Sequence, residues 1–383
     1  MTRIVRMVLT VVLVGASLIG ASRIGPSPRG QGQQNRENAA LTEWRLHDYS
    51  GNAFVGSKVC AQCHTKEAST QIASPMAHAL SLSADCQILG RRPRLVFRNG
   101  SYTYQIIREG NQSIYTVTDG ATKVSEPIRY CFGLGKVGQT YLIKYGGQFY
   151  ETRLSYYQGI EKLDFTTGHP RAEPRSLPDA LGRPLSAEET GNCFGCHSTA
   201  SLDGSQFQED RVIPGITCEG CHGPGQKHLV AVKDKKLKNL QILNPGNLDA
   251  DTLSQEFCGT CHRSFDDVML LPGQGGINNI RFQPYRIFNS PGHKGDLRIN
   301  CLACHNPHDK LERKASAYDS KCLACHLADS HEAKTSHRTA PACPISKQEC
   351  VTCHMPRIEV TEMHNKFTDH WIRIVKPGAP TPN

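Results

Sequence analysis

Seven copies of one short motif dominate the chemistry of this chain. Each copy has two cysteines separated by two residues and a histidine directly after the second cysteine. The cysteine pairs are Cys60/Cys63, Cys193/Cys196, Cys218/Cys221, Cys258/Cys261, Cys301/Cys304, Cys322/Cys325 and Cys350/Cys353. The histidines that follow them are His64, His197, His222, His262, His305, His326 and His354.

The motif is the attachment signature of a c-type haem. Two thiols at this spacing reach the two vinyl groups of one porphyrin, and the adjacent imidazole meets the iron from the proximal side. Cysteine pairs also occur in zinc sites and in thioredoxin-like redox proteins. Neither alternative accounts for the histidines, because 17 of 383 residues are histidine and the chance of one after all seven pairs is on the order of 10^-10. The sequence therefore predicts seven covalent haems c.

The distal ligands decide between an electron carrier and an enzyme. A second histidine on each iron closes the site, whereas an open sixth position admits a small molecule. Ten histidines lie outside the motifs, which is enough for seven irons. His78, His228 and His308 lie near motifs and are the best placed, with a surface histidine or a propionate partner as the alternative for each.

Charge does not indicate a nucleic-acid partner. The formal net charge is +9, but each ferric haem with its two propionates contributes roughly −1. We therefore expect no nucleic-acid binding, and the basic side chains mostly offset the cofactors.

The N-terminus predicts export. Arg3 and Arg6 precede an apolar run over 7–19, as in a signal peptide, and an uncleaved membrane anchor is the alternative. We predict a signal peptide over 1–22, a flexible tether over 23–51, a first haem segment over 52–91, an antiparallel β insert over 92–165 and a six-haem domain over 166–383. The predicted location is the periplasm or the cell exterior.

Five segments predict the strands of the β insert, because they are rich in β-branched and aromatic residues. They cover residues 95–97, 102–107, 113–117, 141–145 and 149–154. Asn99-Gly100 and Gly146-Gly147 separate two pairs of them and predict hairpin turns. The sequence Gly133, Gly135, Gly138 matches a dinucleotide fingerprint, but β-forming residues follow it, so we interpret these glycines as turns.

The remaining chain predicts loops and short helices, with haems rather than side chains filling the core. Ser186 and Glu189 form a capping box that predicts a short helix leading into Cys193, and a similar helix is expected after Asp249. About 47 residues per haem are too few to insulate each cofactor, so neighbouring haems should pack closely. The predicted fold class is a multihaem cytochrome, loop-rich with short α-helices around a packed haem array, plus a small antiparallel β insert.

Three cysteines lie outside the motifs. Cys86 and Cys131 flank much of the β insert, and a disulfide between them is one possibility in an oxidising compartment. Cys343 would then be an unpaired thiol or an iron ligand. Cysteine pairings do not follow from sequence alone.

Several segments resemble the multihaem cytochrome c-554 family. They are Gly191-Asn-Cys-Phe-Gly-Cys-His197, Cys218-Glu-Gly-Cys-His-Gly-Pro-Gly225, Cys301-Leu-Ala-Cys-His-Asn-Pro-His308, Cys350-Val-Thr-Cys-His-Met-Pro356 and Phe367-Thr-Asp-His370. The resemblance implies distal ligation by His78, His228, His308, His364 and His370, with His169 a further candidate. For the seventh iron, His337 is preferred over His293.

The resemblance implies electron transfer between redox proteins, which the sequence does not identify. The alternatives are a multihaem reductase or oxidase of a small nitrogen compound at one open haem, and a subunit of a haem filament. We expect a carrier rather than an enzyme, and no catalytic residue is assigned.

Overall fold

The structure is a computed structural model of the chain. It describes residues 51–376 except 237, 271–276, 296–297 and 327–342, together with residues 378, 380 and 381. All of them belong to the unit Ala39–Asn383. The predicted signal peptide, all but Gly51 of the predicted tether, and His337 lie outside the described residues.

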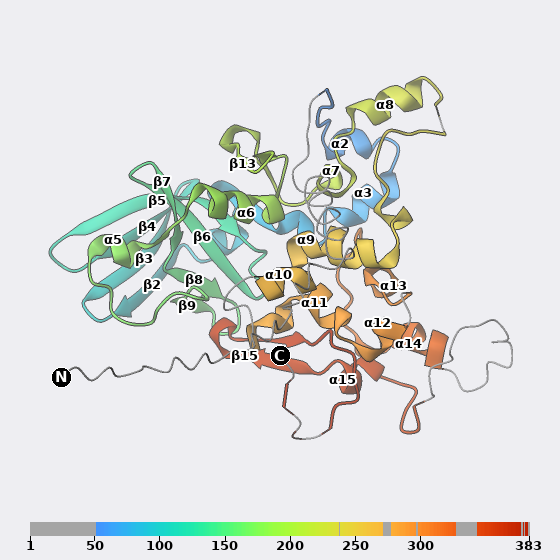
Figure 1. Ribbon diagram of the computed structural model, residues 1–383. Coiled ribbons are helices and arrows are strands. Elements are labelled where there is room, and N and C mark those ends of the chain that lie inside the picture. The colour runs from blue at the N-terminus through green and yellow to red at the C-terminus, as the bar shows by residue number, and fades with distance from the viewer. Residues whose placement is uncertain are drawn as a thin grey trace, which may run out of the picture. The chain divides into compact units, whose positions relative to one another are not determined.

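A ten-stranded antiparallel sheet occupies the first half of the described chain, with the strand order β10-β7-β6-β5-β4-β3-β2. Strand β1 pairs with β5, and β8 lies between β6 and β9. Figure 1 shows these strands gathered apart from the helices α9–α15. The strands are β1 (Leu80–Leu82), β2 (Arg94–Asn99), β3 (Tyr102–Glu109), β4 (Gln112–Thr118), β5 (Lys123–Phe132), β6 (Gly138–Tyr145), β7 (Gln148–Thr152), β8 (Leu154–Tyr157), β9 (Lys162–Phe165) and β10 (Gly182–Pro184).

Alternating side chains explain why these segments form a sheet. In β3, Tyr102, Tyr104 and Ile106 are buried, and the residues between them are half-buried. Such alternation places every second side chain on one face of a strand. Four of the five predicted strand segments are confirmed. The fifth, 149–154, covers most of β7 and the first residue of β8, with a break at Arg153. Gly100 lies in a hairpin turn with a φ of +59°.

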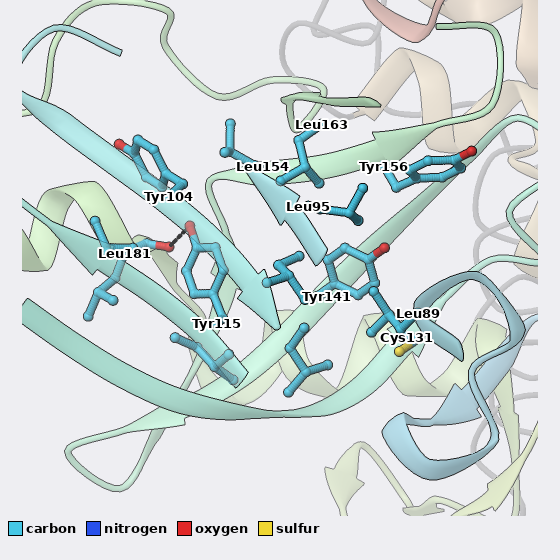
Figure 2. Close-up of a cluster of buried hydrophobic side chains, with 14 of the residues drawn as sticks. Leu89, Leu95, Tyr104, Tyr115, Cys131, Tyr141, Leu154, Tyr156, Leu163 and Leu181 are labelled. Carbon is cyan, nitrogen blue, oxygen red and sulfur yellow. Dashed lines mark hydrogen bonds between the residues drawn. The ribbon is translucent and has the colours of Figure 1, made fainter. Parts of the chain in front are cut away.

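The main core lies on this sheet and includes residues from outside the strands. Leu89 of α4 (Gln87–Arg91) and Leu181 of α5 (Leu177–Leu181) are fully buried in it. The Tyr115 hydroxyl donates a hydrogen bond to the Leu181 carbonyl, at 3.2 Å (Figure 2). The sheet and its core therefore extend beyond residues 92–165 at both ends.

Short helices and loops make up most of the remaining described chain. The other α-helices are α2 (Ser57–Cys60), α3 (Thr65–Gln71), α6 (Ala187–His197), α7 (Cys218–His222), α8 (Gln226–Lys233), α9 (Gly259–His262), α10 (Phe265–Leu270), α11 (Gln283–Phe288), α12 (Pro291–Gly295), α13 (Cys301–Cys304), α14 (Asp319–His326) and α15 (Cys350–His354). The single turns are η2 (Met76–His78), η3 (Ser83–Asp85), η4 (Glu209–Arg211), η5 (Pro245–Asn247), η7 (Ile277–Arg281), η8 (Ala315–Tyr318) and η9 (Thr361–Met363), while η6 (Thr252–Cys258) is a π-helix.

Three two-stranded ladders complete the secondary structure. They are β11 (Ser198–Thr199) with β14 (Ile213–Pro214), β12 (Leu202–Asp203) with β13 (Gln206–Phe207), and β15 (Arg357–Val360) with β16 (Asn365–Thr368). Short helices and an antiparallel sheet agree with the predicted fold class. Within the described chain, no helix has the length and apolar character needed to cross a membrane.

Local predictions about helices and turns agree with the structure. Ser186 and Glu189 form the expected capping box at the start of α6. The expected helix after Asp249 takes the form of η6, and the Asp249 carboxylate accepts a hydrogen bond from the Thr252 amide at 3.0 Å. Strand β6 begins at Gly138, so the glycine-rich segment leads into a strand, as predicted.

Candidate functional site

All seven motifs lie on short helical turns. The two cysteines of each motif are one turn apart, and the histidine ends the turn or follows it directly, as in α7 (Cys218–His222) and α13 (Cys301–Cys304). Helical geometry places side chains three residues apart on one face. Each turn can therefore present two thiols and one imidazole to the same ligand.

Four of the predicted attachment cysteines lie outside the protein core. The second cysteine is exposed in the first, fourth, sixth and seventh motifs, whereas the other ten motif cysteines are half-buried; the exposed ones are Cys63, Cys261, Cys325 and Cys353.

In the first and seventh motifs, the exposed cysteine lies on or beside a short turn at the surface. Neither α2 nor α15 buries any of its own residues, so the polypeptide covers only one side of such a turn. The first cysteine, as in Cys60 and Cys350, then lies half-buried against a neighbouring motif, and the second lies on the open side. An exposed thiol is accessible to a haem vinyl group, so haem attachment at these four cysteines stays a prediction from the motif.

Three motif histidines face a second histidine from a distant part of the chain. The ring centroids are 6.4 Å apart for His64 and His228, 6.0 Å apart for His222 and His308, and 6.3 Å apart for His305 and His370. The His222 and His308 planes are nearly parallel, with an interplanar angle of 6°. In each pair the first ring belongs to a motif and the second does not.

This spacing fits two axial ligands of one iron. A metal-binding imidazole nitrogen lies about 2.0 Å from the metal and about 1.2 Å from its own ring centre, so two rings on opposite sides of a metal have centroids about 6.4 Å apart. The porphyrin supplies four further nitrogens, so the protein must supply only two ligands. Among the described residues, no group of three or more His, Cys, Asp or Glu side chains could hold a metal ion without such a cofactor.

Backbone carbonyls orient several of the rings. Three motif histidines donate from Nδ1 to a carbonyl: His197 to Ala79 at 3.0 Å, His222 to Leu243 at 2.8 Å, and His354 to Arg373 at 2.9 Å. Three histidines outside the motifs do the same: His228 donates to Leu240 at 2.8 Å, His293 to Ile299 at 2.9 Å, and His370 to Thr368 at 3.1 Å. A proton held on Nδ1 leaves the lone pair on Nε2, the atom that then binds a metal.

Two paired rings are also held in the neutral form. Burial, together with the neighbouring His305, lowers the pKa of His370 to about 4. Burial also lowers the pKa of His222, and His308 adds to this shift. Neutral imidazole is the form that coordinates iron.

The other predicted distal ligands lie in different surroundings. His169 and His364 use Nε2 to contact the carboxylates of Glu151 and Asp164, at 3.0 and 2.7 Å. His78 lies in η2, behind the break at Pro75, and its ring hydrogen-bonds to no described residue. Neither contact brings His169 or His364 to a motif histidine, so their ligand role stays a prediction from sequence, as does that of His78.

His293 is better placed than the sequence suggested. Its side chain lies on α12 and is 2% exposed, and Nδ1 is bound to the Ile299 carbonyl while Nε2 hydrogen-bonds to no described residue. The preferred alternative, His337, lies outside the described residues. The choice between His293 and His337 for the seventh iron therefore stays open.

Motifs that are distant in sequence contact one another through their cysteines. The first cysteines lie close enough to influence one another's pKa, in the pairs Cys60 with Cys218, Cys258 with Cys301 and Cys322 with Cys350. The corresponding helices also pack in pairs, α2 with α7, η6 with α13 and α14 with α15. The second motif reaches the fourth, because the Cys196 thiol donates to the Thr260 carbonyl at 3.6 Å.

A buried ion pair anchors the segment that carries His370. Arg286 and Asp369 are both fully buried and form two hydrogen bonds, Nε to Oδ1 at 2.8 Å and Nη2 to Oδ2 at 2.9 Å. The Arg286 guanidinium also lies over the Trp371 ring, 4.9 Å from its centre. Ser290 donates to the carbonyl of His370 itself. The C-terminal segment is therefore fixed to α11 on both sides of this histidine.

Glu219, inside the third motif, joins that motif to the start of the described chain. Its side chain is 1% exposed and accepts hydrogen bonds from the amides of Val55, Gly56 and Gly225, each at 2.8 Å. In the sequence, this residue is only a spacer between the two motif cysteines. Its role depends on chain segments more than 160 residues apart, which no local pattern reveals.

Comparison with known proteins gives a family and two structures. Residues 167–223 match the sequence model of the family described as cytochrome c554 and c-prime. No curated protein sequence matches the chain.

Both structures have low sequence identity to this chain. The crystal structure of the outer cell wall cytochrome OcwA has a TM-score of 0.48 and 16% identity, over 85% of this chain and 80% of OcwA. The octahaem sulfite reductase MccA of Wolinella succinogenes has a TM-score of 0.43 and 13% identity, over 88% of this chain and 60% of MccA. The family match spans the second and third CxxCH motifs, and it agrees with the resemblance to the multihaem cytochrome c-554 family that the sequence predicted.

Proposed function

We propose that this protein carries seven covalently attached haems c and relays electrons between redox proteins. The observation that carries the proposal is the set of three histidine pairs whose ring centroids lie 6.0 to 6.4 Å apart. Two imidazoles on one iron leave no position for a substrate, which favours electron transfer over catalysis at these haems. Each bound haem supplies a one-electron iron couple.

The proposed ligands follow from the motifs and the pairs. The fourteen motif cysteines, the four exposed ones included, attach the haems, and the seven motif histidines are proximal ligands. His228 is the distal partner of His64, His308 that of His222, and His370 that of His305. His293 is proposed as a further distal ligand because it is buried and its Nδ1 is already bound to a carbonyl.

Contacts between motifs support close packing of the haems. The first motif contacts the third, the fourth contacts the fifth and the sixth contacts the seventh through their first cysteines. Because the second motif is joined to the fourth, these contacts group the motifs as 1-3, 2-4-5 and 6-7. Haems attached to touching motifs are neighbours, and electron transfer requires such proximity.

The location and the partners follow from the N-terminal segment and the cofactor. We place the mature protein outside the cytoplasm, in the periplasm or beyond, with redox proteins as donor and acceptor and no nucleic-acid partner. An uncleaved N-terminus would hold it at the membrane. N-terminal sequencing of the exported protein distinguishes cleavage within residues 19–24 from a retained anchor.

Intact-mass analysis tests the cofactor count. Protein matured in a periplasm should gain roughly 616 Da for each of seven haems, and the haems should resist extraction in acid. Four or fewer additions would overturn the proposal. Colourless protein that loses metal to chelators would indicate zinc instead.

Electron paramagnetic resonance of the oxidised protein tests the function. A carrier with closed irons gives low-spin ferric signals that integrate to the haem count. A high-spin signal that changes with nitrite, hydroxylamine or cyanide would indicate an open haem and favour a reductase or oxidase of a small nitrogen compound.

A further inference from the structure

Two of the three cysteines outside the motifs lie together in the main core. Cys86 is 2% exposed and Cys131 is fully buried, and both belong to the hydrophobic cluster on the large sheet. Figure 2 shows Cys131 beside Leu89 of α4, the helix that follows Cys86 directly. Cys343 is half-buried and lies more than 200 residues further along the chain.

Backbone pairing brings these two cysteines to the same place. Cys131 on β5 is the register partner of Ser81 on β1. The chain then makes one turn, η3 (Ser83–Asp85), and returns Cys86 to the same strand. Arg108 holds this turn, because its guanidinium donates to the carbonyls of Ser83 and Ala84, at 2.6 and 2.9 Å.

Both cysteines lie in the same buried cluster, and each influences the pKa of the other. The contact with Cys131 lowers the pKa of Cys86, partly opposed by burial, while burial raises the pKa of Cys131. Gln139 fixes Cys86 from the other side, since the thiol lies 2.9 Å from Oε1 of Gln139 and Nε2 of Gln139 donates to the Gly133 carbonyl. Two cysteines buried in the same part of a core, and brought there by the pairing of β1 with β5, are placed for disulfide formation.

We propose that Cys86 and Cys131 form a structural disulfide in the exported protein. The oxidant is the disulfide of a thiol–disulfide oxidoreductase. The Cys86 thiolate attacks one sulfur of that disulfide and releases a thiol, and the Cys131 thiolate then displaces the second sulfur. One Sγ–Sγ bond forms, the donor's disulfide bond is broken, and the two protons end on the donor's thiols.

The bond would fasten the first haem segment to the sheet. Strand β1 follows Ala79, whose carbonyl accepts hydrogen bonds from the Gly133 amide at 2.8 Å and from Nδ1 of His197 at 3.0 Å. A covalent link between Cys86 and Cys131 holds β1 against β5 and so keeps that carbonyl in reach of His197. Cys86 and Cys131 belong to no CxxCH motif, so this bond does not depend on the number of haems.

Peptide mapping of the mature protein tests the proposal directly. Trypsin places Cys86 in the peptide 67–91 and Cys131 in the peptide 130–136. Without reductant, the two peptides should be recovered joined, about 2 Da lighter than their summed mass, and alkylation should label neither cysteine. Recovery of both peptides alkylated, or of either peptide joined to Cys343, would overturn the proposal. Because the assignment is made peptide by peptide, it stands apart from any shortfall in haem attachment.

Reductant sensitivity provides a second measurement. Opening the disulfide should shift the unfolding equilibrium of wild-type protein by roughly 30- to 1,000-fold toward the unfolded state. The variant Cys86→Ala/Cys131→Ala should show no response to reductant, and the matched control Cys343→Ala should respond as the wild type does. A wild-type protein that unfolds identically with and without reductant would contradict a structural bond.

Discussion

Replacing Asp369 by asparagine should destabilise the protein and loosen the segment that holds His370, a proposed iron ligand. The substitution keeps the size of the side chain but removes the charge that Arg286 faces. Asp369 accepts two hydrogen bonds from Arg286 at 2.8 and 2.9 Å, with both side chains fully buried. Removing one partner of a buried pair leaves the other charge uncompensated, so Asp369→Asn should cost about 3–5 kcal/mol in unfolding free energy.

The cost should depend on pH with a defined sign. Burial alone would raise the pKa of Asp369, but the hydrogen bonds from Arg286 and the Trp371 amide outweigh it and lower the pKa. Because the folded-state pKa lies below the unfolded value of about 3.9, the contribution to stability is complete above that value. It is lost as the pH falls through the folded-state pKa. The difference between wild type and Asp369→Asn should therefore shrink in strong acid.

Guanidinium unfolding followed by circular dichroism measures this cost. A matched control is Asp203→Asn, which breaks the exposed pair with Arg211 and should cost less than about 1 kcal/mol. The double variant Arg286→Met/Asp369→Leu removes both charges and should cost clearly less than the two single variants together. The reasoning is refuted if Asp369→Asn costs no more than the control, or if the single-variant costs add.

Three further perturbations test other contacts. His370→Ala should add one high-spin iron to the paramagnetic resonance spectrum. His364→Ala tests whether His364 is a ligand: if it coordinates an iron, this variant also gains one high-spin iron, and if it only contacts Asp164, the spectrum does not change. Glu219→Ala leaves three amides without their acceptor, so it should cost about 3 kcal/mol or more and accelerate amide hydrogen exchange at residues 55–56. Gly215→Ala places a Cβ 2.0 Å from the Ala77 carbonyl oxygen, whereas Gly110→Ala meets nothing within 4 Å although both glycines have positive φ. Thermal unfolding should show a larger loss for Gly215→Ala, and equal losses would exclude a role for the Ala77 contact.

Local patterns predicted the local structure well. The strand signals of Tyr102–Ile107 and the capping box at Ser186 depend on neighbouring residues, and both predictions are confirmed. Strand β5 was missed, because Pro127 lies within it and Lys123 to Glu126 are mostly polar. Its pairing with β4 and β6 makes it a strand, and sequence periodicity does not contain that tertiary information.

Distal ligands were harder to predict than attachment motifs. A CxxCH motif holds all its information within five residues, but His370 meets His305 from 65 positions further along the chain. The resemblance suggested His228, His308 and His370, which the structure brings to motif histidines, and also His169 and His364, which it brings to carboxylates. Each of these histidines lies near polar or aromatic neighbours, so the sequence alone does not separate them.

The contacts between first cysteines of different motifs have a consequence for biogenesis. Cys258 and Cys301 touch, and this contact lowers the pKa of the Cys301 thiol, so a chain that folded before receiving its cofactors would present reactive thiol pairs to the oxidants of the exporting compartment. Cross-links between motifs would then consume the very sulfurs that must form thioethers. Maturation should therefore act on an extended, reduced chain, with a dedicated reductant working ahead of folding. The same oxidising machinery that would close Cys86 onto Cys131 must be kept away from the fourteen motif cysteines until haem has capped them.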